Sequence, residues 1–275
     1  MVARVKELNL LLPLSHAALD SFGASAIAPG RMVFSSISGS HLYGFPSKDS
    51  DIDLRGAYVA PLRSVVSLRE SVETREVSST IDGVLVEGVF HEVAKYFRLL
   101  VKGNGYVIEQ ILSPIGIARS KEFAELQRLA PRFMTRKTVL GHYSGFSASQ
   151  LSLVRRHPHK GVKLILYAFR VLMTGINALR TRQIEANIVE LNKTFQFDFI
   201  DQLVDMKIAR ENSPLGGGGH SVDWYIAKAE ELRGTLESEA VASELPSAPD
   251  PASIDELDDL LYALRVATAA TEALK

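Results

Sequence analysis

The chain has 275 residues, of which 46% are hydrophobic and 23% charged, so its length and composition suit one large or two modest globular domains. Its 31 Lys and Arg residues against 32 Asp and Glu leave a net charge of −1, which excludes a general attraction for nucleic acid or an anionic membrane. Cysteine is absent, which excludes a disulfide framework, a thiolate zinc site and a cysteine nucleophile. We expect a reducing, cytoplasmic location.

Two apolar stretches resemble membrane signals. The first, 2–19, is interrupted by polar residues and Pro13, so we interpret it as a docking segment and not as a secretory signal. The second, 162–179, is long enough to cross a bilayer but holds Lys163 and Arg170, which are costly in lipid. We therefore predict the central helix of a soluble domain and no membrane partner.

Residues 1–115 have the pattern of an α/β (α+β) core with a mixed sheet. Short apolar runs bounded by turn residues predict strands, and Asp82-Gly83 is typical of a hairpin turn. Apolar residues at helical spacing before Gly103 predict a helix with a glycine stop. In chain order we predict strands at 31–37, 51–59 and 84–90 and a helix at 91–102.

Residues 116–275 are predicted to form a helical C-terminal domain. Ser253 and Glu256 have the spacing of a capping box. No Gly-Lys-Ser/Thr follows Gly216 to Gly219, so this run is not a phosphate-binding loop, and its role as a lid stays open. We predict helices at 119–156, 162–179, 185–195 and 223–237, a linker at about 238–252 and a final helix at about 254–274.

The main chemical signal is the pair Asp51 and Asp53. Residues two apart on a strand point to the same face, so the two carboxylates converge. Anions this close repel each other unless a cation lies between them. Oxygen ligands suit Mg²⁺ or Mn²⁺, which complete their coordination with water and substrate phosphates. A solvated acidic loop is the plainest alternative, and a phosphatase nucleophile is disfavoured by Leu54-Arg55 after the pair.

A second signal precedes the acids. Gly39 allows close approach of the backbone to a ligand, and Ser40 can offer a hydroxyl and an N–H group to a phosphate. One loop for phosphate and one strand for metal ions are the two requirements of phosphoryl transfer.

Two-metal phosphoryl transfer usually needs a third carboxylate on a neighbouring strand. Asp82 lies in the predicted turn, and Glu92 falls in the first helical turn, where acids often only satisfy the helix dipole. Glu87 lies mid-strand among apolar residues, so we choose it. A buried salt bridge is the alternative role for Glu87.

The string GSHLYGFPSKDSDIDLRG at 39–56 resembles the DNA-polymerase-β-like nucleotidyltransferase superfamily. With KGNG at 102–105 and Glu109, it is most similar to the RNA-repair-pathway-associated predicted nucleotidyltransferases (RlaP/YcgL-like). The resemblance covers about 35–115, with a weaker likeness at the central helix. It departs at Asn104-Gly105, where the family pattern has Asn followed by Pro. It implies that Gly39 and Ser40 bind NTP phosphates and that two ions are bound by Asp51, Asp53 and Glu87.

Further nucleotide contacts are expected, each with a structural alternative. Ser50 is counted among the nucleotide-binding residues. Arg55 either contacts the nucleotide or pairs with a nearby acid. Lys163 and Arg170 share a face of the central helix and either hold the triphosphate or extend from a core helix.

A local basic patch could contact RNA. The alternative is an exposed helix end. The patch comprises Arg155, Arg156, His157, His159 and Lys160.

Together these features predict metal-dependent transfer of NMP from an NTP to a hydroxyl, with release of pyrophosphate. The family's association favours an RNA (tRNA-like) 3′ end as acceptor. Nucleotidylation of a protein or small-molecule hydroxyl, a non-catalytic NTP-binding sensor and a metal-dependent phosphohydrolase are the alternatives. No motif specifies the base or the oligomeric state.

Overall fold

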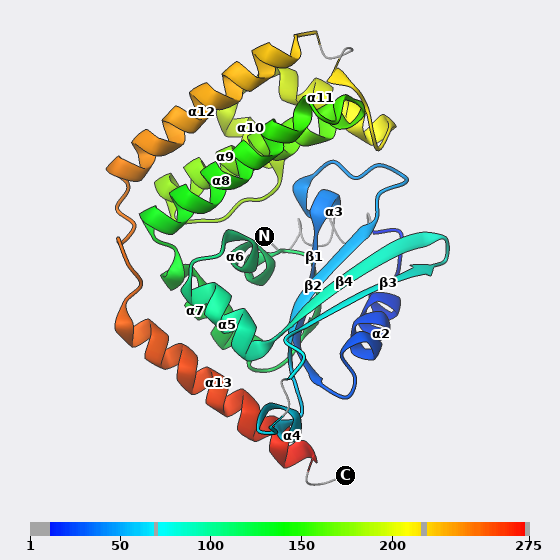
Figure 1. Ribbon diagram of the computed structural model, residues 1–275, viewed down its shortest axis with the longest axis vertical. Coiled ribbons are helices and arrows are strands. Elements are labelled where there is room, and N and C mark those ends of the chain that lie inside the picture. The colour runs from blue at the N-terminus through cyan, green and yellow to red at the C-terminus, as the bar shows by residue number, and fades with distance from the viewer. Residues whose placement is uncertain (1–11, 69–70, 216–218, 273–275) are drawn as a thin grey trace. The chain divides into compact units, whose positions relative to one another are not determined.

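The computed structural model describes residues 12–68, 71–215 and 219–272, which divide into two compact units (Figure 1). The first contains the chain up to residue 39, residues 51–133 and the chain from 249 onward. The second contains 40–50 and 134–248. The expected division at residue 115 therefore differs from the observed one, because each unit is built from separate segments of the chain.

A mixed sheet forms the centre of the first unit, as predicted, and it has five strands, two more than the three that were located from the sequence. The strand order is β3-β4-β2-β1-β5, with β2 and β4 parallel and the other neighbours antiparallel. The strands are β1 (Arg31–Ser38), β2 (Ile52–Val59), β3 (Thr74–Ile81), β4 (Val84–Glu92) and β5 (Gly116–Arg119).

The predicted hairpin is confirmed between β3 and β4. Its turn residues Asp82 and Gly83 have φ of 47° and 81°. Two successive positive φ values are what a two-residue hairpin turn requires, and the Asp-Gly pair supplies them at little cost.

The two faces of the sheet are different in character. Helix α2 (His16–Ile27) covers one face, where the β2 and β4 side chains are fully buried, as Leu54 and Phe90 show. On the opposite side lie α5 (Val93–Val101) and α6 (Gly105–Leu112), as Figure 1 shows. On that second face Asp53 and Arg55 of β2 and Glu87 of β4 are only half-buried, whereas Ala57 and Val59 at the end of β2 are fully buried. The half-buried part of the face leaves room for polar residues.

The C-terminal helix α13 (Pro251–Glu272) belongs to the first unit and not to the helical one. Arg265 Nη1 lies 2.6 Å from the buried Glu92 carboxylate, and Arg31 Nε donates to Thr268 Oγ1 at 3.0 Å. These long-range contacts explain why the sequence did not reveal the helix's partner. The described residues of this unit also form three short elements: α4 (Leu62–Val65), α7 (Phe123–Leu129) and the 3₁₀ helix η1 (Ala130–Phe133).

Helix α13 begins three residues before the predicted position. The Ala252 N–H donates to Asp250 Oδ1 at 3.2 Å, so Asp250 is the residue that satisfies the start of the helix. Pro251 suits the first helical position because its missing N–H has no intrahelical partner there. The expected capping box at Ser253 and Glu256 is therefore wrong: Ser253 is fully buried inside the helix, and Glu256 pairs with Arg128 and Arg132.

The second unit is a helical bundle around α9 (Gly161–Thr181), which matches the predicted central helix. Among the described residues one helical stretch, Pro158–Thr181, is long and apolar enough to cross a membrane, and 78% of its most apolar window is buried, as in a core helix. Among the described residues its other elements are α3 (Gly39–Tyr43), α8 (Arg136–Val154), the 3₁₀ helix η2 (Pro158–Lys160), α10 (Ile188–Phe195), α11 (Asp198–Ala209) and α12 (Val222–Ala242).

Three expectations on connecting segments have different outcomes. The linker is shorter than predicted, because α12 continues to Ala242. Residues 216–218 of the glycine loop lie outside the described residues, as does most of the N-terminal stretch.

Candidate active site

Asp53 and Glu87 are direct neighbours in the sheet. They are register partners on the parallel strands β2 and β4. Laterally paired residues point to the same face, and here it is the face that α2 leaves uncovered. Ser38 on β1 and Ser78 on β3 are the next partners on either side, so four polar residues form one row across the sheet. A mid-strand acid at position 87 is tolerated because it lies on this half-buried face.

Asp51 lies directly before the first residue of β2 and is exposed. Its position two residues before Asp53 places it at the end of the strand that carries the acid row. The other two acids considered for the third position lie elsewhere. Asp82 is in the hairpin turn, and Glu92 accepts the Ala94 N–H at 2.9 Å as the N-cap of α5.

A cavity of about 260 Å³ runs along β3 and β4 beside the acid row. Glu87 lines it together with Glu76 and Ser78 of β3. Space is therefore available next to the Glu87 carboxylate.

Arg55 supplies positive charge directly beside the acids. Its Nη2 donates to Asp53 Oδ1 at 2.5 Å and its Nη1 donates to the Glu87 carbonyl oxygen at 2.8 Å. The structural alternative considered for Arg55, an ion pair with a nearby acid, is what the structure contains.

The three acids have the ligand atoms that a hard divalent ion prefers, but their side chains are not grouped around a common point. Asp51, Asp53 and Glu87 offer only oxygen atoms, which is the chemistry that Mg²⁺ and Mn²⁺ prefer. Within residues 12–68, 71–215 and 219–272, no three His, Asp or Glu side chains are grouped as a metal ion requires. The residues therefore fit the ion in type and in strand position, while Asp53 is engaged by Arg55.

Position 39 requires glycine because the backbone there lies very close to the Asp53 side chain. Its φ is +63°, and a Cβ at this position would lie 1.8 Å from Asp53 Oδ2. The backbone that leaves β1 thus passes directly beside the acid row, where no larger residue fits. Ser40 follows as the first residue of the second unit, and its carbonyl oxygen accepts the Gly44 N–H at 3.1 Å.

Two predicted nucleotide-binding residues converge on a carboxylate that sequence reasoning missed. Glu211 accepts hydrogen bonds from Ser50 Oγ at 2.9 Å and Lys163 Nζ at 2.8 Å. Ser47 Oγ at 2.7 Å and the fully buried Lys207 Nζ at 2.5 Å complete the group, which we name the Glu211 cluster. Ser47 and Glu211 are 164 positions apart, so no local pattern could have revealed the contact.

The Glu211 cluster has a strong electrostatic effect. Burial alone raises the pKa of Glu211, but the hydrogen bonds from the two lysines and two serines outweigh it and lower the pKa to about 2. The carboxylate is therefore ionised at all physiological pH values and fixes the loop that precedes Asp51.

Arg170 is placed away from any surface. It is fully buried, and its guanidinium carbon lies 3.8 Å from the centroid of the Tyr43 ring, a close cation–π contact. A side chain with no exposed area is unsuited to bind a diffusing nucleotide, so we leave Arg170 out of the proposed site.

The predicted basic patch is exposed throughout, from Arg155 to Lys160. His157 and Lys160 also line a cavity of about 350 Å³ with Lys163, beside the aromatic residues Phe146 and Tyr167. Basic groups beside aromatic rings are a combination that suits single-stranded nucleic acid.

Comparison with known proteins identifies a matching family and two similar proteins. Residues 15–263 match RlaP, the RNA repair pathway DNA polymerase beta family. The uncharacterized protein MJ0002 of Methanocaldococcus jannaschii is 27% identical over 183 residues, which are 65% of this chain and 74% of that protein. A crystal structure of a nucleotidyltransferase-like protein from Exiguobacterium sibiricum aligns with 93% of this chain and 77% of its own, at 11% identity and a TM-score of 0.32. That structural likeness is too slight to carry an argument.

Proposed function

Because the chain belongs to the RlaP family, the RNA repair pathway DNA polymerase beta family, we propose that it is a nucleotidyltransferase that moves NMP from an NTP to the 3′ hydroxyl of an RNA. The observation that carries the proposal is the placement of Asp53 and Glu87 as register partners on parallel strands, with Asp51 at the start of one of them. Arg55 pairs with only one of these two carboxylates, and like charges side by side on a half-buried face remain costly unless further positive charge is bound.

In this proposal all three acids bind metal ions, and Glu87 also accepts a proton. Asp51, Asp53 and Glu87 would hold two Mg²⁺ ions, which supply charge neutralisation at the phosphates and lower the pKa of the attacking hydroxyl. The hydroxyl oxygen attacks the α-phosphorus, and the bond from that phosphorus to the bridging oxygen breaks as pyrophosphate leaves. The hydroxyl proton passes to Glu87. The backbone at Gly39 and Ser40 would receive the phosphates of the NTP.

The exposed basic patch supports RNA as the acceptor. The chain as a whole carries a net charge of −1, so a polyanion needs a local site. The residues from Arg155 to Lys160 provide one, next to a cavity that also contains aromatic side chains.

Transfer of label from each α-labelled NTP tests the proposal, with Mg²⁺ or Mn²⁺ and with RNA, protein lysate or the enzyme alone as acceptor. We expect metal-dependent labelling of RNA that Glu87→Gln and Asp51→Asn/Asp53→Asn abolish while the fold is retained. Asp20→Asn, which changes an exposed acid on α2 at the opposite face of the sheet, serves as the matched control and should keep full activity.

The outcomes separate the competing functions. Labelling of protein instead of RNA would show that the acceptor is a protein hydroxyl. NTP binding without any transfer would favour a sensing role. Activity of Glu87→Gln at the wild-type rate would remove this residue from the site.

A further inference from the structure

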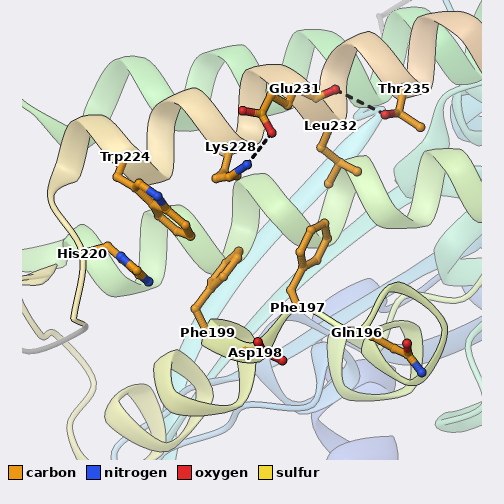
Figure 2. A pocket seen from close by; sticks show the side chains of 10 residues that line it. All are labelled: Gln196, Phe197, Asp198, Phe199, His220, Trp224, Lys228, Glu231, Leu232 and Thr235. Carbon is orange, nitrogen blue, oxygen red and sulfur yellow. Dashed lines mark hydrogen bonds and ion pairs between the residues drawn. The ribbon is translucent and has the colours of Figure 1, made fainter.

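A third cavity, of about 400 Å³, lies in the helical unit between residues 196–199 and α12 (Figure 2). Its volume falls in the range of small-ligand sites. Its wall is formed by Phe197, Phe199, Trp224 and Leu232, and polar side chains stand around this wall. The transfer chemistry proposed above uses none of these residues.

The aromatic wall is suited to hold a flat ring. The Phe199 ring centroid lies 5.3 Å from that of Trp224 and 5.4 Å from that of Phe197. The imidazole of His220 already stacks on the Trp224 indole, with centroids 3.7 Å apart and planes within 12° of parallel. The indole therefore accommodates a planar nitrogen heterocycle in the structure itself, and proteins hold unpaired bases by stacking of this kind.

The charges around the cavity indicate which part of a ligand would enter. Lys228 Nζ pairs with Glu231 Oε2 at 2.6 Å, and Asp198 adds a further carboxylate. The resulting surplus of negative charge opposes a phosphate group. Carboxylate oxygens accept hydrogen bonds from amino groups, so the cavity favours an uncharged aromatic ring that carries such a group.

We propose that this cavity binds one unpaired amino-bearing nucleobase of the RNA, with the sugar and phosphate left outside. Only the choice of RNA as the source of the base rests on the function proposed above. Adenine, cytosine and guanine carry an exocyclic amino group and uracil does not, so adenine-rich strands should bind better than uridine-rich ones.

The chain has a single tryptophan, and it is Trp224, so the intrinsic tryptophan fluorescence reports on this cavity alone. The full-length protein is titrated with single-stranded oligo(A), oligo(U), adenosine and ATP. We expect quenching by oligo(A) and, at higher concentration, by adenosine, with oligo(U) about tenfold weaker than oligo(A). Quenching by ATP with none by oligo(A) overturns the assignment to RNA. The absence of quenching by all four overturns the proposal.

Variants locate the binding within the cavity. Phe197→Ala removes one aromatic wall at a half-buried position and should weaken oligo(A) binding about tenfold. Asp198→Asn should reduce the ratio of the affinity for oligo(A) to the affinity for oligo(U). Glu237→Gln, an exposed substitution on α12 outside the cavity, is the control and should bind like the wild type. Wild-type affinity in a folded Phe197→Ala protein would refute the site.

The fluorescence titration contains no NTP turnover, so the two proposals fail separately. Quenching that survives without any nucleotidyl transfer contradicts the proposed function alone. Transfer to RNA that proceeds without quenching, and equally well in Phe197→Ala, contradicts the base site alone.

Discussion

At the scale of single residues, the acid row is balanced by one guanidinium. Arg55 donates to the Asp53 carboxylate and to the Glu87 backbone carbonyl, while Gly39 allows the chain to pass beside the same carboxylate. Arg55 therefore supplies positive charge that a divalent ion would otherwise supply, and it competes with such an ion for Asp53.

This competition predicts the effect of Arg55→Met. Removal of one positive charge beside the acids is worth about 1 kcal/mol or more at an effective dielectric constant of about 20, so Mn²⁺ should bind about five- to tenfold more tightly. Titration calorimetry without nucleotide measures this affinity. Arg75→Met is the matched control, because Arg75 is the register partner of Phe90 on the opposite face of the sheet. Unchanged or weaker Mn²⁺ binding by Arg55→Met would contradict the competition.

At the scale of secondary-structure elements, the Glu211 cluster joins the loop before Asp51 to the helical bundle. Ser47 and Ser50 belong to that loop, Lys163 to α9 and Lys207 to α11. A single carboxylate thus fixes three segments that are far apart in the chain. Ser50 and Lys163 were expected to bind nucleotide, and in the structure they share this carboxylate.

The cluster predicts a pH-dependent contribution to stability. Glu211 has a pKa of about 2 in the folded protein against an ordinary 4.5, so its contribution is complete above about pH 4.5 and is lost as the pH falls toward 2. Glu211→Gln should lower the free energy of unfolding by about 3 kcal/mol at pH 7, because the buried Lys207 loses this carboxylate. Urea unfolding at pH 7 and pH 3 should show the difference from wild type shrinking at the lower pH. A difference that stays constant across this range would exclude the carboxylate's charge as its cause.

Elements with strong local patterns could be predicted, and those defined by distant contacts could not. The Asp82-Gly83 turn, strand β2 and helix α9 were predicted from local patterns of turn residues and apolar residues, whereas the parallel pairing of β2 with β4 was not. Strand β5 has only four residues and exists through its pairing with β1, so it has no local signal. Glu87 could be chosen from the sequence because a carboxylate among apolar strand residues needs a partner that compensates its charge.

At the scale of the whole molecule, both compact units are discontinuous in sequence. The first unit includes α13 from the C-terminal part of the chain. The second unit includes residues 40–50, which lie in sequence between β1 and β2. A linear division of the sequence cannot represent this arrangement, since composition changes along the chain do not record which segments meet in space. The near-neutral net charge of the whole chain likewise does not show where charges cluster, and it conceals the exposed basic run from Arg155 to Lys160.

The most direct test of the central claim follows both ends of the NTP in one reaction. RNA with a free 3′ hydroxyl is incubated with Mg²⁺ and an NTP labelled at either the α- or the γ-phosphate. We predict that α-label enters the RNA and γ-label appears in pyrophosphate, and that Asp53→Asn abolishes both. Release of γ-label as inorganic phosphate, with no α-label in RNA, would instead establish a phosphohydrolase and contradict nucleotidyl transfer.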